Sequence, residues 1–150
     1  NITHRHLYGD SMGGFNSLRW FIDTKVKFNG LSVICPAIPY SLIPDQDATL
    51  YEPYNTFWSF QAEILFGKNS HSGRNFSFDD VVENVQSKKE LKRFTLISVS
   101  PDSFGFYEGN QVLVQKLEPL FNKGQFYFET KSVRHCDVES KALALRLLDR

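Results

Sequence analysis

The chain has 150 residues, which is enough for one domain with a hydrophobic core. Its formal net charge at pH 7 is zero. The balanced charge argues against a nucleic-acid or anionic-membrane binding protein, and no apolar run reaches the length of a membrane span. Cys35 and Cys136 are too few for a disulfide framework and lack metal-ligand spacing. We therefore predict buried or unused thiols, no metal and no cofactor. No signal peptide is visible and the sequence does not fix a location, although the cytoplasm is favoured.

The first predicted element is a short strand over residues 2–8 that runs into the segment GDSMG at 9–13. The G-x-S-x-G spacing is typical of a nucleophile elbow, a sharp strand-to-helix turn that presents a serine hydroxyl at the edge of a sheet. Gly9 and Gly13 flank the serine where strand and helix come closest. Ser11 is therefore the candidate nucleophile. The alternative is a glycine-rich turn with an incidental serine.

A helix is predicted after the elbow from apolar residues at helical spacing, namely Phe15, Leu18, Phe21 and Ile22. Strand, elbow and helix together resemble the C-terminal half of an α/β-hydrolase domain. In that family four strands and an oxyanion loop precede the elbow strand, whereas only eight residues precede Gly9 here. The resemblance implies a mostly parallel sheet that is flanked by helices and lacks its N-terminal strands. A missing N-terminal segment or a partner domain would supply them.

Continuous apolar residues at 31–35 predict the next strand, covered on both faces and stopped by Pro36. From there to about residue 77, prolines interrupt regular structure and aromatic residues are dense. The resemblance implies that residues 37–77 form a small cap-like insertion within a single domain spanning 1–150. The alternative is an aromatic surface helix packed on the core. His71 is interpreted as an exposed loop histidine.

A further helix is predicted to begin after Ser77 and to end in a basic run at 88–93, which we interpret as a solvated helix end. Residues 94–100 are rich in β-branched and aromatic side chains and predict a strand. Asp102 follows this strand directly, where the family keeps its triad acid. It is otherwise an ordinary turn aspartate. Glu108 is a second choice because it lies farther from the strand end.

The last predicted elements are a helix over 110–121, with a final turn distorted by Pro119, and a strand over 125–130. The loop after this strand contains His135. The family keeps its general base in this loop. Asp137 is interpreted as the cap of a final helix and not as the partner of the imidazole.

The order Ser11, Asp102, His135 is the order of the family's catalytic triad. The resemblance implies that His135 takes the serine proton and that Asp102 orients the ring. Ser11 then attacks an acyl carbonyl to form an acyl-enzyme. The amide of Met12 would bind the oxyanion, while the second donor normally comes from the upstream loop. The implied function is a serine hydrolase acting on a small-molecule or glycan acyl ester.

Two alternatives to hydrolysis stay open. Residues 94–102 and 134–137 resemble α/β-hydrolase-like proteins that modify bacterial surface glycans, including accessory-secretion and capsule O-acetylation proteins. This resemblance implies an O-acyltransferase that passes an acetyl group to a surface polysaccharide or glycoprotein glycan, using the same triad with an alcohol in place of water. The absence of an oxyanion loop instead favours a non-catalytic binding or assembly module.

Overall fold

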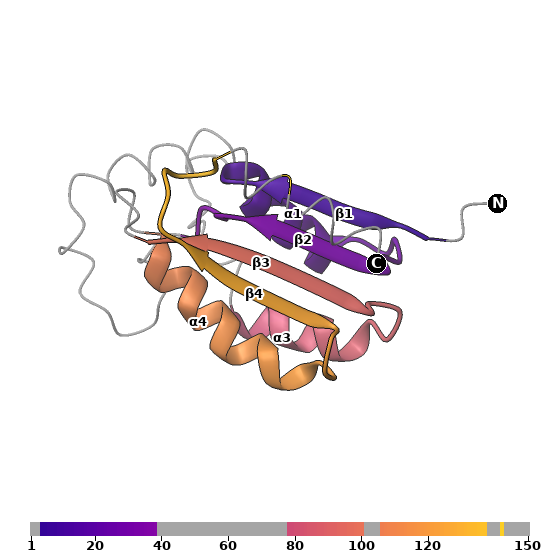
Figure 1. Cartoon of the computed structure of the whole chain (residues 1–150). Helices are drawn as coiled ribbons and strands as arrows, with labels where there is room; N and C mark the ends of the chain where they lie inside the picture. The colour runs from indigo at the N-terminus through magenta and orange to yellow at the C-terminus, as the bar shows by residue number, and fades with distance from the viewer. Residues whose placement is uncertain (1–3, 39–77, 101–105, 138–141, 143–150) are drawn as a thin grey trace.

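A computed structural model of the chain describes residues 4–38, 78–100, 106–137 and 142. These residues form a sheet of the strands β1 (His6–Asp10), β2 (Gly30–Ile34), β3 (Arg93–Val99) and β4 (Phe126–Lys131). The strands lie side by side in their sequence order, and each neighbouring pair is parallel (Figure 1). The predicted parallel α/β sheet is confirmed.

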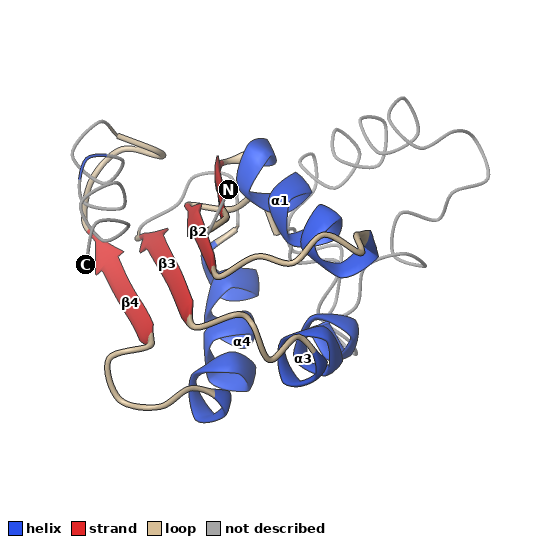
Figure 2. Ribbon diagram, turned by 90° about the vertical axis from the view of Figure 1, so that its right-hand side faces the viewer, coloured by secondary structure: helices blue, strands red, loops and turns tan. Residues whose placement is uncertain are grey.

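Helices connect the parallel strands: α1 (Met12–Asp23), α3 (Phe78–Ser87) and α4 (Tyr107–Leu117). Each new strand is added on the same side of the last, so right-handed crossovers place the helices on one face of the sheet. Figure 2 shows these helices together on that face. Within the described residues, no helix combines the length and apolarity needed to cross a membrane.

The element boundaries follow the sequence pattern with small, explicable shifts. β1 begins at His6, so residues 4 and 5 lie outside the strand predicted over 2–8, and the amide of Arg5 donates to the side chain of Asn29 at 3.0 Å. Pro119 has the predicted effect, because α4 ends at Leu117 and a 3₁₀ turn, η4 (Glu118–Leu120), replaces its last turn. Of the predicted cap-like insertion at 37–77, residues 39–77 lie outside the described residues, as does most of the predicted final helix.

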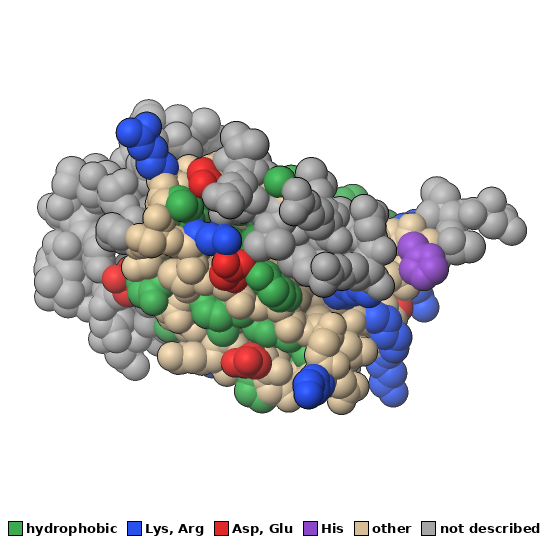
Figure 3. All heavy atoms as spheres, viewed as in Figure 1, with side chains coloured by type: hydrophobic (Ala, Val, Ile, Leu, Met, Phe, Trp, Pro, Cys, Tyr) green, Lys and Arg blue, Asp and Glu red, His purple; other side chains and the backbone are tan. Residues whose placement is uncertain are grey.

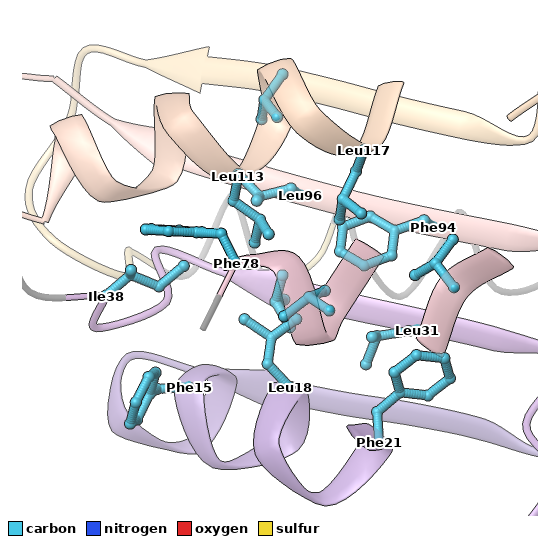
Figure 4. Packing of buried hydrophobic residues seen from close by; sticks show 14 of the residues in the cluster. Phe15, Leu18, Phe21, Leu31, Ile38, Phe78, Phe94, Leu96, Leu113 and Leu117 are labelled. Atoms are coloured by element: carbon cyan, nitrogen blue, oxygen red, sulfur yellow. The ribbon is translucent and has the colours of Figure 1, made fainter. Parts of the chain in front are cut away.

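The hydrophobic core lies between the helices and the sheet (Figure 4). Every residue of β2 is buried, which confirms a strand covered on both faces. Phe94 of β3 stacks on Phe126 of β4 with ring centroids 5.5 Å apart. Fully burying one such large apolar side chain stabilises the fold by about 1.5–3 kcal/mol. The completely buried side chains with labels in Figure 4 are Leu18, Phe21, Leu31, Ile38, Phe94, Leu96, Leu113 and Leu117.

Lys88 does more than the solvated helix end that we predicted for the basic run. Its Nζ donates to the carbonyls of Phe21, Ile22 and Thr24 at the C-terminus of α1, with distances of 3.3 Å to Ile22 and 3.1 Å to Thr24. The last carbonyls of a helix lack intrahelical partners and carry partial negative charge. Lys88 therefore caps α1 from the end of α3 and joins the two helices.

One face of the molecule shows how charged side chains of the described residues are distributed. On the face drawn in Figure 3, acidic and basic side chains of the described residues are interspersed around a hydrophobic area.

His6 forms a half-buried polar pair on the sheet face away from the helices, where its Nε2 lies 3.0 Å from Ser32 Oγ. Burial, with a smaller contribution from the charge of Arg93, lowers the pKa of His6 to about 4. The folded pKa is thus below the unfolded value, so the unfolded chain binds a proton first as pH falls. The stability contributed by neutral His6 is complete above pH of about 6.5 and is lost toward pH 4.

We therefore expect the free energy of unfolding to fall between pH 7.5 and 4.5, and to fall less in His6→Gln, which has no titrating ring. Urea unfolding of both proteins at the two pH values measures this difference. Equal losses in wild type and variant would show that His6 does not carry the pH dependence.

Candidate active site

Ser11 occupies a strained turn between β1 and α1, with φ 50° and ψ −123°. This region is unfavourable for any residue with a side chain, and such strain is concentrated at functional sites. Backbone hydrogen bonds hold the turn: the Ser11 amide donates to the carbonyl of Ile34 at 2.9 Å, and the Ser11 carbonyl accepts from Ala37 at 3.0 Å. The end of β2 thus fixes the serine at the carboxyl edge of the sheet.

The two glycines of the elbow have different roles. A Cβ on Gly9 would overlap the carbonyl group of Gly13 and come within 2.5 Å of Ser17 Oγ. A Cβ on Gly13 would meet only Asp10 Oδ1, at 3.8 Å. Strand and helix therefore approach too closely for a side chain at Gly9, while Gly13 contributes its backbone to the contact and has room for a methyl group.

This difference predicts opposite outcomes for a matched pair of variants. We expect Gly9→Ala to lower the free energy of unfolding by about 3 kcal/mol, because the fixed backbone of α1 cannot move away. Gly13→Ala should be neutral or slightly stabilising, since alanine is favoured over glycine inside a helix by about 1 kcal/mol. Denaturant unfolding of both variants measures the difference. Equal effects would contradict this account of the elbow.

His135 lies beside Ser11 although the two residues are 124 positions apart in sequence. The loop after β4 places His135 Nε2 3.0 Å from Ser11 Oγ. The ring also packs against Phe106 at the start of α4, with centroids 5.7 Å apart. With its proton on Nδ1, the imidazole presents a lone pair at Nε2 to the serine hydroxyl, the tautomer that a general base requires.

The remaining predicted site residues are Met12, the proposed oxyanion donor, and Asp102, the proposed triad acid. Met12 is the first residue of α1, where amide groups have no intrahelical partner and the helix dipole favours negative charge. Asp102 lies outside the described residues, so its role as triad acid stays a prediction. The alternative acid, Glu108, is in the first turn of α4.

A disulfide between Cys35 and Cys136 corrects the prediction of two unused thiols. The Cα atoms are 5.7 Å apart, although the residues are separated by 101 positions. Cys35 directly follows β2, and Cys136 follows His135 in the loop after β4. The sequence did contain a signal for the pairing, because the carboxyl ends of parallel strands meet at one edge of a sheet. The prediction considered only the number and spacing of the cysteines, so it missed the pairing.

Three residues of the types that bind metal ions lie together beside the serine: Cys35, His135 and Cys136. Their ligand atoms lie within 4.8 Å of one another. The disulfide engages both sulfur atoms, whereas metal binding by cysteine requires free thiolates. This oxidised arrangement therefore serves as a covalent link between the two loops.

Comparisons with known proteins identify the fold. No protein-family description and no curated protein sequence matches the chain. In structure the chain is similar to esterase B from Lactobacillus rhamnosis, determined with a tributyrin phosphonate (20% identity, TM-score 0.62, covering 99% of this chain and 52% of that one). It is also similar to a monoacylglycerol lipase from Paleococcus ferrophilus (13%, TM-score 0.53, 99% and 70%).

A third similar structure is an S-formylglutathione hydrolase from Agrobacterium tumefaciens (14% identity, TM-score 0.52, covering 99% of this chain and 47% of that one). The chain spans about half the length of this hydrolase and of the esterase. The chain thus has an α/β-hydrolase-like fold, as the resemblance of its strand, elbow and helix implied.

Proposed function

We propose that the protein is a serine hydrolase that cleaves acyl esters, with Ser11 as the nucleophile and His135 as the general base. The observation that carries this proposal is the 3.0 Å distance between Ser11 Oγ and His135 Nε2. A strained positive-φ serine, in contact with an imidazole at the carboxyl edge of a parallel sheet, is the arrangement that nucleophilic catalysis needs. The names of the similar structures, an esterase, a lipase and a hydrolase, agree with this chemistry.

In the proposed mechanism, His135 Nε2 accepts the hydroxyl proton while Ser11 Oγ attacks the acyl carbonyl. The carbonyl oxygen becomes an oxyanion, and the amide of Met12 at the N-terminus of α1 donates a hydrogen bond to it. The imidazolium then passes its proton to the leaving alcohol, giving the acyl-enzyme. Asp102 is the proposed acid that orients the imidazole and stabilises its positive charge.

Water or an alcohol can then take the acyl group from Ser11. In hydrolysis His135 deprotonates water, which attacks the ester and releases a carboxylic acid; with an alcohol as acceptor the product is a new ester. We favour hydrolysis because the similar structures are named as an esterase, a lipase and a hydrolase. The acceptor therefore decides between a hydrolase and an O-acyltransferase.

Turnover of p-nitrophenyl acetate, followed by nitrophenol release and by acid production, tests the proposal. Parallel reactions with and without an oligosaccharide separate transfer from hydrolysis. We expect one carboxylic acid for each nitrophenol in water. Acylated oligosaccharide in place of acid would identify an acyltransferase. A folded protein without turnover of this ester or its butyrate analogue would point to a non-catalytic binding module and contradict the proposal.

A further inference from the structure

The Cys35–Cys136 disulfide joins the proposed base to the frame that holds the proposed nucleophile. Cys35 is fully buried, and its amide donates to the carbonyl of Ile97 in β3 at 2.6 Å, so this end is fixed to the sheet. Cys136 belongs to the loop after β4 and is adjacent to His135 in sequence. The bond therefore fixes the backbone next to the imidazole relative to the sheet edge.

The same region holds the elbow. The carbonyl of Ile34, one residue before Cys35, accepts the hydrogen bond from the Ser11 amide at 2.9 Å and lies 3.7 Å from Cys136 Sγ. The amide of Ser11 and the sulfur of Cys136 thus both lie next to the carbonyl group of Ile34. The disulfide therefore lies next to the peptide group that holds the backbone of Ser11.

The two cysteines differ in exposure. Cys35 has no exposed surface, whereas Cys136 is partly exposed in a loop with the exposed neighbours Ser132 and Arg134. Thiol–disulfide exchange requires an attacking thiolate to reach one sulfur of the bond. Cys136 is the partly exposed residue of the pair, so it is the end of the bond that an external thiolate meets first.

We propose that the Cys35–Cys136 disulfide is a redox-controlled clamp on the loop of His135 and that Cys136 is its exchange site for a small dithiol. This inference rests on the proposed function of Ser11 and His135. A thiolate of the dithiol attacks Cys136 Sγ, the S–S bond breaks, and Cys35 leaves as a thiolate that takes a proton. The second thiolate of the dithiol attacks the mixed disulfide and releases Cys136. Two electrons and two protons pass to the protein, and the dithiol becomes a disulfide.

Reduction frees the loop of His135 from Cys35 while β2 and β3 keep their backbone pairing. The imidazole then samples positions away from Ser11, so the fraction of molecules with a productive Ser11–His135 contact falls. Oxidation restores the link and the contact. The chain has only two cysteines, so a reductant acts on no other bond of this chain.

The test compares the oxidised protein with the protein reduced by dithiothreitol, both in the presence of a metal chelator. The chelator prevents the freed thiolates and His135 from capturing an ion. Titration in denaturant should detect no free thiol per chain before reduction and two free thiols per chain after it. The rate of Ser11 labelling by a fluorophosphonate should fall at least about tenfold on reduction and recover on reoxidation. The double variant Cys35→Ser/Cys136→Ser should be labelled as slowly as the reduced wild-type protein, both with and without dithiothreitol.

Hydrogen exchange gives a readout that does not depend on catalysis. Reduction should speed exchange in residues 132–136 and leave β2 and β3 protected. Faster exchange throughout the sheet would mean global unfolding and would overturn a local clamp. Equal labelling and equal exchange in both redox states would also overturn it, while leaving the proposed function intact. Failure of labelling in both states, with the expected local exchange, would instead remove the proposed function and keep the clamp.

Single variants locate the exchange site. In Cys35→Ser, the remaining thiol of Cys136 should form a mixed disulfide with oxidised glutathione, detected as an added mass. In Cys136→Ser, the buried thiol of Cys35 should react at least about tenfold more slowly. Faster modification of Cys35 would contradict the assignment of Cys136.

Discussion

Replacement of Ser11 by alanine should lower kcat/KM for ester hydrolysis by about 10⁴-fold or more, because the variant has no oxygen to form the acyl-enzyme. Alanine meets the same unfavourable φ of 50° as serine, so the elbow should keep its shape. Initial rates with p-nitrophenyl acetate, with circular dichroism as the check of folding, measure this effect.

Ser87→Ala is the matched control for this substitution. Ser87 is an exposed serine in the last turn of α3, and its hydroxyl donates to the carbonyl of Asn84 at 3.1 Å. Removing its hydroxyl should leave kcat/KM unchanged. A folded Ser11→Ala variant with wild-type activity would mean that another group is the nucleophile or that the activity comes from a contaminant.

His135→Ala should lower kcat by about 10²–10⁴-fold, since a positioned general base contributes an acceleration of that size. Substrate binding should change much less, because the imidazole acts on the proton of Ser11. Separate measurement of kcat and KM with the same ester tests this division. His135→Gln should be equally impaired, because an amide of similar polarity cannot accept the proton.

His4→Gln is the control for the histidine series, because His4 is exposed and precedes β1. His6 is unsuitable, since its ring is half-buried beside Ser32. We expect wild-type rates for His4→Gln. A His135→Ala variant that keeps kcat within about threefold of wild type would remove His135 from the mechanism.

The elements that local sequence determines were predicted well. The apolar runs at β2 and β3, the effect of Pro119 on α4 and the elbow at Ser11 each follow from neighbouring residues. Steric limits, hydrophobic pattern and proline geometry act over a few residues, so they can be recognised without coordinates.

The features that sequence reasoning missed depend on residues far apart in the chain. Lys88 caps α1 across more than sixty positions, reaching the carbonyl of Thr24, which is 64 residues away. The disulfide of Cys35 and Cys136 spans 101 positions, and no local pattern distinguishes these cysteines from buried thiols. Such contacts depend on how the crossovers bring strand ends together.

The candidate site combines both kinds of information. The sequence predicted the order of Ser11, Asp102 and His135. In the described structure, Ser11 Oγ lies 3.0 Å from His135 Nε2. The packing of Phe106 on His135 was not foreseen, because it arises where the start of α4 meets the loop after β4. Asp102 lies outside the described residues, so its role as the triad acid stays a prediction.

Mapping a fluorophosphonate adduct by peptide mass spectrometry tests the central claim most directly, because the probe reacts with a serine only when a neighbouring base activates it. Native protein should carry one adduct, on the peptide that contains Ser11. The adduct should be greatly reduced in His135→Ala and absent from heat-denatured protein. An adduct at other residues, equal labelling of native and denatured protein, or folded protein without any adduct would contradict the account.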